Sequence, residues 1–165
     1  MENITKFEKV SISQYQKDLE KNNIKETNTF IDIKLPKRAT TGSAGYDFYL
    51  PFDLKLNPNE TILIPTGIRC KMNPNYVLML FPRSSLGFKY RLMLDNTVGI
   101  IDSDYYNALN EGHIMIKVTN NSLDNKILEL KKGDAFAQGI FMIFGKTCDD
   151  DVTDERIGGF GSTNK

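Results

Sequence analysis

Two carboxylates stand two residues apart, Asp102 and Asp104, directly after the apolar run 98–101. In extended backbone, side chains at positions i and i+2 point to the same side of a strand. The pair could therefore share a metal ion, or one carboxylate could act as a general base. An Asp-rich turn that closes a hairpin explains the same residues, and the pattern alone leaves both interpretations open.

A group of hydrogen-bond donors, Arg83, Ser84 and Ser85, directly follows the apolar segment 76–81. A planar arginine fork and two hydroxyls suit the oxygens of a phosphate chain. An ordinary polar turn at the end of a strand explains the same three residues. The segment is a candidate anion site with a purely structural alternative.

Two further polar features lie near the end of the chain. Gln138 is a polar residue inside an apolar strand that follows a tight turn at Gly133, so its side chain needs a partner. The segment 156–163 is rich in glycine, and such backbone can form an anion-binding nest to which Ser162 and Thr163 would add hydroxyl donors. A mobile tail is the ordinary outcome for this composition.

The remaining titratable residues offer little catalytic chemistry. His113 is the only histidine, and no second imidazole or hydroxyl nucleophile is placed around it, so we expect it to pack or hydrogen-bond. Cys70 and Cys148 stand far apart without a CxxC motif, which excludes a zinc site or a disulfide framework. Both are expected to be core thiols in a reducing cytosol.

The composition fits one soluble globular domain, with 40% hydrophobic and 25% charged residues among 165. The 21 basic and 21 acidic residues cancel, which argues against wrapping nucleic acid through many phosphate contacts. No apolar stretch is long enough for a signal peptide or a membrane span. We expect a cytoplasmic protein that binds neither nucleic acid nor membrane.

Apolar residues alternate with polar ones in many short segments after Phe30. The pattern predicts strands around 31–35, 54–56, 62–64, 68–70, 76–81 and 114–118. Asn, Pro and Gly clusters separate them. Many short strands with almost no helical pattern predict an all-β sandwich, jelly roll or closed barrel.

These patterns divide the chain into three regions. Residues 1–29 form an extension in which Ser13 and Gln16 have capping-box spacing, so a short surface helix is expected there. Residues 30–145 form the β core. Residues 146–165 are acidic and then glycine-rich, and form a C-terminal arm.

Taken in order, five segments resemble the five motifs of the homotrimeric deoxyuridine triphosphatase (dUTPase) family. The order is highly specific and covers the chain from about Leu35 to its end. The matching segments are SAGYDFYL at 43–50, PRSSLG at 82–87, NTVGIIDSDYY at 96–106, GDAFAQGIF at 133–141 and GGFGST at 158–163.

The resemblance implies a jelly-roll subunit, a homotrimer with active sites between subunits, and hydrolysis of dUTP to dUMP and pyrophosphate with Mg²⁺. This reaction keeps uracil out of DNA and supplies dUMP for thymidylate synthesis. Asp102 would orient and deprotonate the attacking water. Asp47 would support the water shell of Mg²⁺ indirectly, so that no protein side chain ligates the metal and the substrate phosphates do.

The resemblance also assigns the substrate contacts. The phosphate chain would be held by Arg83, Ser84, Ser85 and Gln138, and the γ-phosphate by Arg156. The nucleoside would be read by Asn96, Gly99, Tyr105 and, through backbone near it, Met115. In the arm that closes the site, Phe160 would stack over uracil, while Gly161, Ser162 and Thr163 close on the phosphates.

Three features depart from the family pattern. Tyr106 and Asn107 stand where the family has Arg-Gly, and the chain is several residues longer before the next strand. Arg156 precedes Phe160 by four residues instead of five. The first thirty residues exceed the family core.

Two alternative functions are compatible with the sequence. One is a dCTP deaminase-like enzyme of the same fold. The other is a trimeric jelly-roll regulatory protein, with a partner docked at 106–112 or at the N-terminal segment.

Overall fold

Short strands make up most of the structure, a computed structural model that describes residues 5–26, 29–156 and 158. The strands are β1 (Lys6–Lys9), β2 (Lys37–Arg38), β3 (Tyr46–Tyr49), β4 (Leu54–Leu56), β5 (Thr61–Pro65), β6 (Ile68–Lys71), β7 (Tyr76–Pro82), β8 (Leu92–Leu94), β9 (Gly99–Ile101), β10 (Met115–Asn120), β11 (Leu128–Leu130) and β12 (Ala135–Ile143). The helices are α1 (Ile12–Lys21), α2 (Ser84–Tyr90) and the 3₁₀ helix η1 (Ser103–Asn107).

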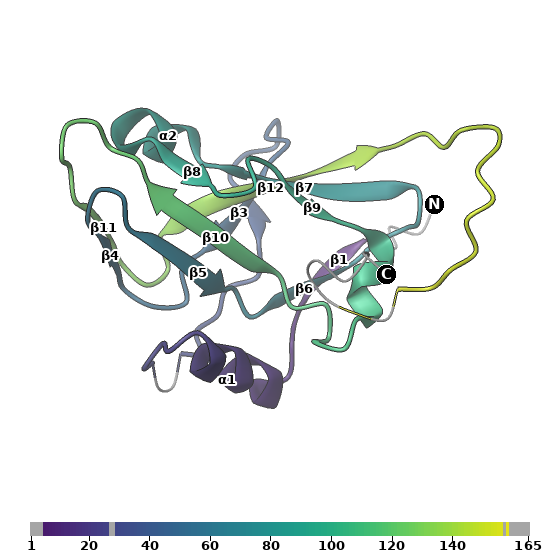
Figure 1. Ribbon diagram of the computed structural model, residues 1–165, viewed down its shortest axis with the longest axis horizontal. Helices are drawn as coiled ribbons and strands as arrows, with labels where there is room; N and C mark the ends of the chain where they lie inside the picture. Colours follow the sequence, from purple (N-terminus) through teal and green to yellow (C-terminus); the bar gives the residue numbers. More distant parts are fainter. Residues whose placement is uncertain (1–4, 27–28, 157, 159–165) are drawn as a thin grey trace.

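The strands form small antiparallel sheets that pack on one another (Figure 1). A five-stranded sheet has the order β2-β3-β12-β7-β9, and a three-stranded sheet has the order β5-β10-β8. The pairs β1-β6 and β11-β4 lie beside them. This arrangement is the all-β, jelly-roll-like fold that the sequence predicts.

The core forms where the inward faces of these sheets meet. Leu78 and Leu80 on β7 are buried, as are Ile116 and Val118 on β10, because alternate residues of a strand share a face. Phe48 of β3 fills the space beside them. The period-two pattern therefore located most of the central strands.

The expected strand at 31–35 is wrong. Ile31 is 80% exposed and Leu35 46% exposed, and only Ile33 between them is buried. The Lys9 ammonium donates to the carbonyls of Phe30 and Ile31, and Ile33 N–H donates to Phe30 O. The backbone turns here because its carbonyl groups accept hydrogen bonds from Lys9 and from a nearby N–H group. A strand would instead need a neighbouring strand as its hydrogen-bond partner.

The N-terminal segment contains both a strand and a helix. β1 pairs with β6, with Phe7 opposite Cys70. The N-cap of α1 is Ser11, whose Oγ accepts from Gln14 N at 3.1 Å, so the capping box expected from Ser13 and Gln16 is misplaced. Tyr15 and Leu19 bury the apolar face of the helix.

Two other expectations need correction. The residues after Arg83 form the helix α2, where the sequence favoured a turn and little helix. Cys70 is buried, as expected, but Cys148 is exposed and is no core thiol. Within the described ranges, the helices are too short and too polar to cross a membrane.

Candidate active site

A polar cluster lies on two neighbouring strands of the large sheet and at the end of a third. Gln138 of β12 stands opposite Asp47 of β3 on one side and Phe81 of β7 on the other. Gln138 Nε2 donates to Pro82 O at 3.2 Å, which supplies the partner that this polar residue requires. Arg83 Nε lies 3.3 Å from Asp47 Oδ1. The structure thus brings Asp47, Arg83 and Gln138 together. The sequence-based assignments place all three at the phosphate chain and its metal, which requires that they lie close together.

The Gln138 side chain lies directly against Gly45. A Cβ at Gly45 would lie 2.5 Å from Gln138 Oε1. The adjoining hydroxyls of Ser84 and Ser85 are on exposed residues at the beginning of α2. Together with the partly exposed Arg83, they offer hydrogen-bond donors that an anion from solvent can reach.

A cavity of about 550 Å³ gathers a second group of predicted residues. Asn96, Gly99 and Met115 all line it, together with apolar side chains of the sheets. A Cβ at Gly99 would lie 3.0 Å from Leu80 Cβ, so glycine lets β9 approach β7 closely at this wall. The volume and the mainly apolar wall with a few polar groups suit a small organic ligand.

Residues that the sequence did not single out complete the wall of this cavity. They come from α1 and from the segment between η1 and β10, and are Asp18, Lys21, Asn22, Leu109 and Asn110. The extra length after Tyr106 was the signal that this part of the wall differs from the family pattern. Nothing in the sequence indicated that α1 would reach the same cavity.

The carboxylates Asp102 and Asp104 meet at one guanidinium. Arg156 Nη2 donates to Asp102 Oδ2 at 2.6 Å, and Arg156 Nε donates to Asp104 Oδ1 at 2.9 Å. The extended backbone assumed for this pair is wrong, because η1 begins at Ser103. A 3₁₀ turn nevertheless leaves both carboxylates within reach of one cation.

Tyr105 is 4% exposed and lies outside the lining of the cavity. Its hydroxyl donates to His113 O at 2.7 Å and accepts from Asn110 Nδ2 at 2.8 Å. Burial raises the pKa of this phenol, and the Asn110 hydrogen bond opposes that effect. The hydroxyl is therefore a neutral link between η1 and β10.

His113 has the structural role that the sequence predicts. Its Nε2 accepts from Gly67 N at 2.8 Å, so the proton resides on Nδ1, which donates to Asp18 Oδ2 at 2.6 Å. Burial raises the pKa of Asp18, but hydrogen bonds from His113 and Gln14 outweigh burial and the net pKa is lowered. The ring ties α1 to the start of β10.

Strand register separates the two groups with catalytic chemistry. β7 and β9 run antiparallel with Leu78 opposite Ile101, so Asp102 falls opposite Val77. Arg83 stands six residues further along β7. At about 3.3 Å per residue, that is roughly 20 Å. Figure 1 shows α2, which follows Arg83, far from the end of β9.

Some predicted residues cannot be placed. Phe160, Gly161, Ser162 and Thr163 lie outside the described residues. In the part of the chain that the structure describes, no three His, Cys, Asp or Glu side chains gather as a metal site.

Comparisons with known proteins identify the family of this chain. A model of the dUTPase family matches residues 32–164. The deoxyuridine 5′-triphosphate nucleotidohydrolase of Lactococcus lactis subsp. lactis is 42% identical over 134 residues, which cover 79% of this chain and 88% of that protein. The crystal structure of dUTPase from Streptococcus mutans has a TM-score of 0.64 and 34% identity, covering 86% of this chain and 97% of that one.

A more distant structure supports the fold alone. It is a mutant dUTPase from phage phi11 of S. aureus, described as coordinating a structural Mg(II) ion. Its TM-score is 0.65 at 19% identity, and the match covers 92% of this chain and 98% of that one. The similarity therefore extends over most of both chains.

Proposed function

This chain belongs to the dUTPase family, and from that premise we propose that it hydrolyses dUTP to dUMP and pyrophosphate through the two groups described above. Water adds its oxygen to the α-phosphorus, and the bond from that phosphorus to the bridging oxygen of the β-phosphate breaks. The observation that carries the proposal is the cluster of Asp47 on β3, Gln138 on β12 and Arg83 directly after β7, beside the two exposed serines of α2.

The phosphate chain is held by donors of this cluster. Arg83 supplies a charged fork, and Ser84 and Ser85 supply hydroxyls. The Gln138 carboxamide donates to Pro82 O, and this hydrogen bond fixes the backbone next to Arg83. The guanidinium contributes most of this binding, because it is positively charged and can donate two parallel hydrogen bonds to phosphate oxygens.

Asp102 is the general base. Arg156 occupies its Oδ2, which leaves Oδ1 as the oxygen that accepts the proton of the attacking water. Arg156 also takes the role at the γ-phosphate that the family resemblance gives it, after exchange from the two carboxylates. The arm residues Phe160, Gly161, Ser162 and Thr163 keep their predicted roles in closing the site.

The nucleoside occupies the 550 Å³ cavity. Asn96, just before β9, Gly99 of β9 and Met115 of β10 line it, in keeping with the roles predicted for them. Tyr105 supports this lining from behind through its hydroxyl hydrogen bonds. The apolar lining suits a neutral pyrimidine ring and a deoxyribose.

Magnesium fits the phosphate cluster as part of a metal-phosphate complex. Asp47 is a single carboxylate already paired with Arg83, too few ligands for a metal cage built by protein, but enough to accept hydrogen bonds from coordinated water. Mg²⁺ ordinarily keeps several waters and takes oxygens from substrate phosphates. When bound, the ion neutralises phosphate charge and makes the phosphorus more open to attack.

The active form is a homotrimer. Arg83 and Asp102 of one chain are roughly 20 Å apart along the β7-β9 pair, which is too far for both to act on one triphosphate. A neighbouring subunit therefore contributes one of the two groups. Sedimentation should give a trimer at assay concentration, and an active monomer would overturn this assembly.

The test of function is substrate selectivity. The purified chain is incubated with MgCl₂ and each of dUTP, dTTP, dCTP, dATP and dGTP, and pyrophosphate is measured. We expect release from dUTP alone. Conversion of dCTP to dUTP without pyrophosphate would indicate the deaminase alternative, which the curated relatives do not favour. A cytoplasmic location remains a prediction from sequence.

A further inference from the structure

The 3₁₀ helix η1 begins directly after the proposed general base. Asp102 is its N-cap, with extended backbone (φ −80°, ψ 157°), and the Asp102 side chain makes no capping hydrogen bond to the helix. Arg156 does not hold this carboxylate during turnover, because the proposed mechanism moves it to the γ-phosphate. A 3₁₀ helix of five residues has little stability of its own. The direction of the Asp102 carboxylate therefore depends on the side chains that fasten η1 to the rest of the protein.

Two adjacent tyrosines of η1 lead to different parts of the fold. Successive residues of a 3₁₀ helix lie about 120° apart around its axis. Tyr105 is buried and donates its hydroxyl to His113 O at 2.7 Å, toward the start of β10. Tyr106 instead contacts the pair β1-β6, which lies beside η1 in Figure 1. Each tyrosine thus fastens η1 to a different element.

The Tyr106 side chain is held on its ring face by a cation and at its hydroxyl by an anion. Its hydroxyl donates to Glu8 Oε2 at 2.5 Å, and the guanidinium carbon of Arg69 lies 3.6 Å from the centre of its ring. Glu8 of β1 and Arg69 of β6 stand opposite each other, with Arg69 Nε 3.6 Å from Glu8 Oε2. Only 28% and 21% of these two side chains is exposed, so solvent screens their contacts less than it screens surface ion pairs.

Glu8 is ionised and is itself oriented by a second partner. Lys6 Nζ lies 2.5 Å from Glu8 Oε1, so Lys6 and Tyr106 take one carboxylate oxygen each. The hydrogen bonds from Lys6 and Tyr106 lower the pKa of Glu8, against burial, which raises it. Tyr106 therefore donates to a carboxylate at neutral pH, which makes its hydrogen bond charge-assisted.

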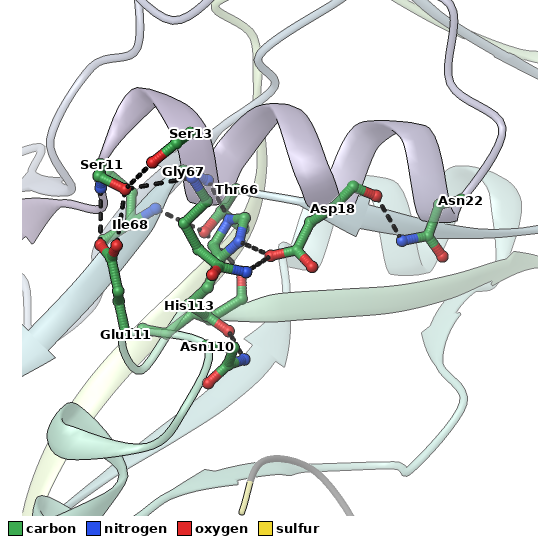
Figure 2. Close-up of polar contacts among 12 residues, drawn as sticks. Ser11, Ser13, Asp18, Asn22, Thr66, Gly67, Ile68, Asn110, Glu111 and His113 are labelled. Atoms are coloured by element: carbon green, nitrogen blue, oxygen red, sulfur yellow. Dashed lines mark hydrogen bonds and ion pairs between the residues drawn. The ribbon is translucent and has the colours of Figure 1, made fainter.

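The chain that follows η1 is fixed by separate contacts. Figure 2 shows Ser11 N and Ser11 Oγ donating to the two carboxylate oxygens of Glu111, at 2.7 and 2.6 Å. The same view shows His113 Nδ1 donating to Asp18 Oδ2 at 2.6 Å. These contacts hold the segment after η1 without using the Tyr106 side chain. Substitutions at Tyr106 therefore leave them in place and remove only the link from η1 to β1-β6.

We propose that Tyr106 is a positioning residue that, held by Glu8 and Arg69, fixes η1 and with it the direction of the Asp102 carboxylate. The inference rests on the proposed function, since it takes Asp102 as the general base. It gives β1, which lies in the extension beyond the family core, a part in catalysis. It also assigns a role to a residue at which this chain departs from the family pattern.

The test measures hydrolysis of dUTP by variants of Tyr106. Tyr106→Leu removes both contacts of the side chain, whereas Tyr106→Phe keeps the ring on Arg69 and loses only the hydroxyl. We expect Tyr106→Leu to lower kcat roughly tenfold and Tyr106→Phe about threefold, with KM within about twofold of wild type in both. Rates are expressed per folded protein, at a temperature where circular dichroism shows each variant folded. Tyr106→Phe carries the test alone if Tyr106→Leu does not fold.

A double-mutant cycle tests the partner of the hydroxyl. Glu8→Ala combined with Tyr106→Phe should be no slower than Glu8→Ala alone, because both changes remove the same hydrogen bond. Glu129→Ala is the matched control, since Glu129 faces Lys55 at 3.1 Å across the separate pair β11-β4, and it should leave kcat unchanged. Additive losses in kcat would mean that Glu8 and Tyr106 act independently and would overturn the proposal.

Hydrogen exchange of the segment 102–108 distinguishes anchoring of η1 from a general loss of stability. Tyr106→Leu and Glu8→Ala should exchange faster than wild type in this segment, and Glu129→Ala should not. An unchanged kcat in folded Tyr106→Leu would overturn the proposal, as would a higher KM without a lower kcat. A wild type that did not hydrolyse dUTP would refute the proposed function and this role with it, whereas an active wild type with unaffected variants would refute this inference alone.

Discussion

The exposed donors at Arg83 and the helical wall, which we define as α1 together with the segment 106–113, represent two ways of building a site. Arg83, Ser84 and Ser85 are adjacent in sequence and at least partly exposed. The helical wall is joined by contacts across 95 and 100 residues of chain, and its key ring, His113, is fully buried. The first region presents donors to solvent, whereas the second pairs its donors with acceptors inside the protein.

The difference separates two kinds of mutational effect. A change at an exposed donor removes an interaction with ligand and leaves the fold intact, because water replaces the lost partner. A change in the helical wall leaves buried polar groups without partners and destabilises the fold itself. Activity and stability measurements should therefore respond to different residues.

The largest effect is expected from Asp102→Asn. The amide keeps the shape of the side chain but cannot accept the proton, so kcat should fall by roughly 10²- to 10⁴-fold. Binding of dUMP, measured by calorimetry, should change little. Asp104→Asn is the matched control, since Asp104 also binds Arg156. An equal loss in both variants would mean that anchoring Arg156, and not proton transfer, is what matters.

The next largest effect is expected from His113→Leu, and it falls on stability. The variant removes the acceptor of Gly67 N–H and the donor to Asp18, both in a buried setting. Leaving such groups unpaired costs about 2–4 kcal/mol. Urea unfolding should show the loss as a lower midpoint with an unchanged slope. A midpoint within experimental error of wild type would show that the helical wall is not held by this ring.

Local patterns in the sequence predicted the sheets well where side-chain burial alternates. β7, β10 and β12 fall where apolar alternation or a tight turn indicated them. The segment 31–35 has the same alternation, but only Ile33 finds a place in the core. Alternation reports that one face is apolar, and it cannot report whether a neighbouring strand is available to pair with it.

The residues of the candidate site also fall into those that local sequence patterns predicted and those that they did not. Asn96, Gly99 and Met115 were predicted from motifs and line one cavity. Asp18 and Asn110 were missed, because their positions depend on α1 reaching a segment about a hundred residues away. Gln14 and Asp18 resemble solvated helix residues in the sequence, yet the structure buries both. Such contacts become visible only once the chain is folded.

Arg83→Ala tests the exposed region. Loss of a charge-assisted donor to phosphate should lower kcat/KM about 10- to 100-fold. The melting temperature should stay nearly constant, because the Arg83–Asp47 ion pair is partly exposed and such pairs stabilise little. Arg83→Lys keeps the charge without the fork and should recover part of the rate. A large drop in melting temperature would show that this region is as structural as the helical wall.

The smallest effect is an acid-dependent loosening of the helical wall. The net pKa of Asp18 is lowered, because the hydrogen bonds from His113 and Gln14 outweigh burial, with Lys21 adding to them. The pKa of Glu111 is lowered by the side-chain and backbone hydrogen bonds of Ser11, with smaller contributions from Arg69 and His113. Lowered carboxyl pKa values stabilise the fold above the ordinary pKa, near 4, and this stabilisation is lost as pH falls through the folded-state values.

Melting temperature is the measurement, taken for the wild type, Asp18→Asn and Glu111→Gln from pH 7 to pH 3. Each variant should melt roughly 2–4 °C below wild type at pH 7, and the gap should close below about pH 4 as the wild-type carboxylates take up protons. Asp124→Asn is the control. Its carboxylate is exposed and pairs with Lys126, itself partly exposed, so its gap should be much smaller at every pH. A gap that stayed constant down to pH 3 would show that Asp18 and Glu111 hold the helical wall through shape and neutral hydrogen bonds, and not through their charge.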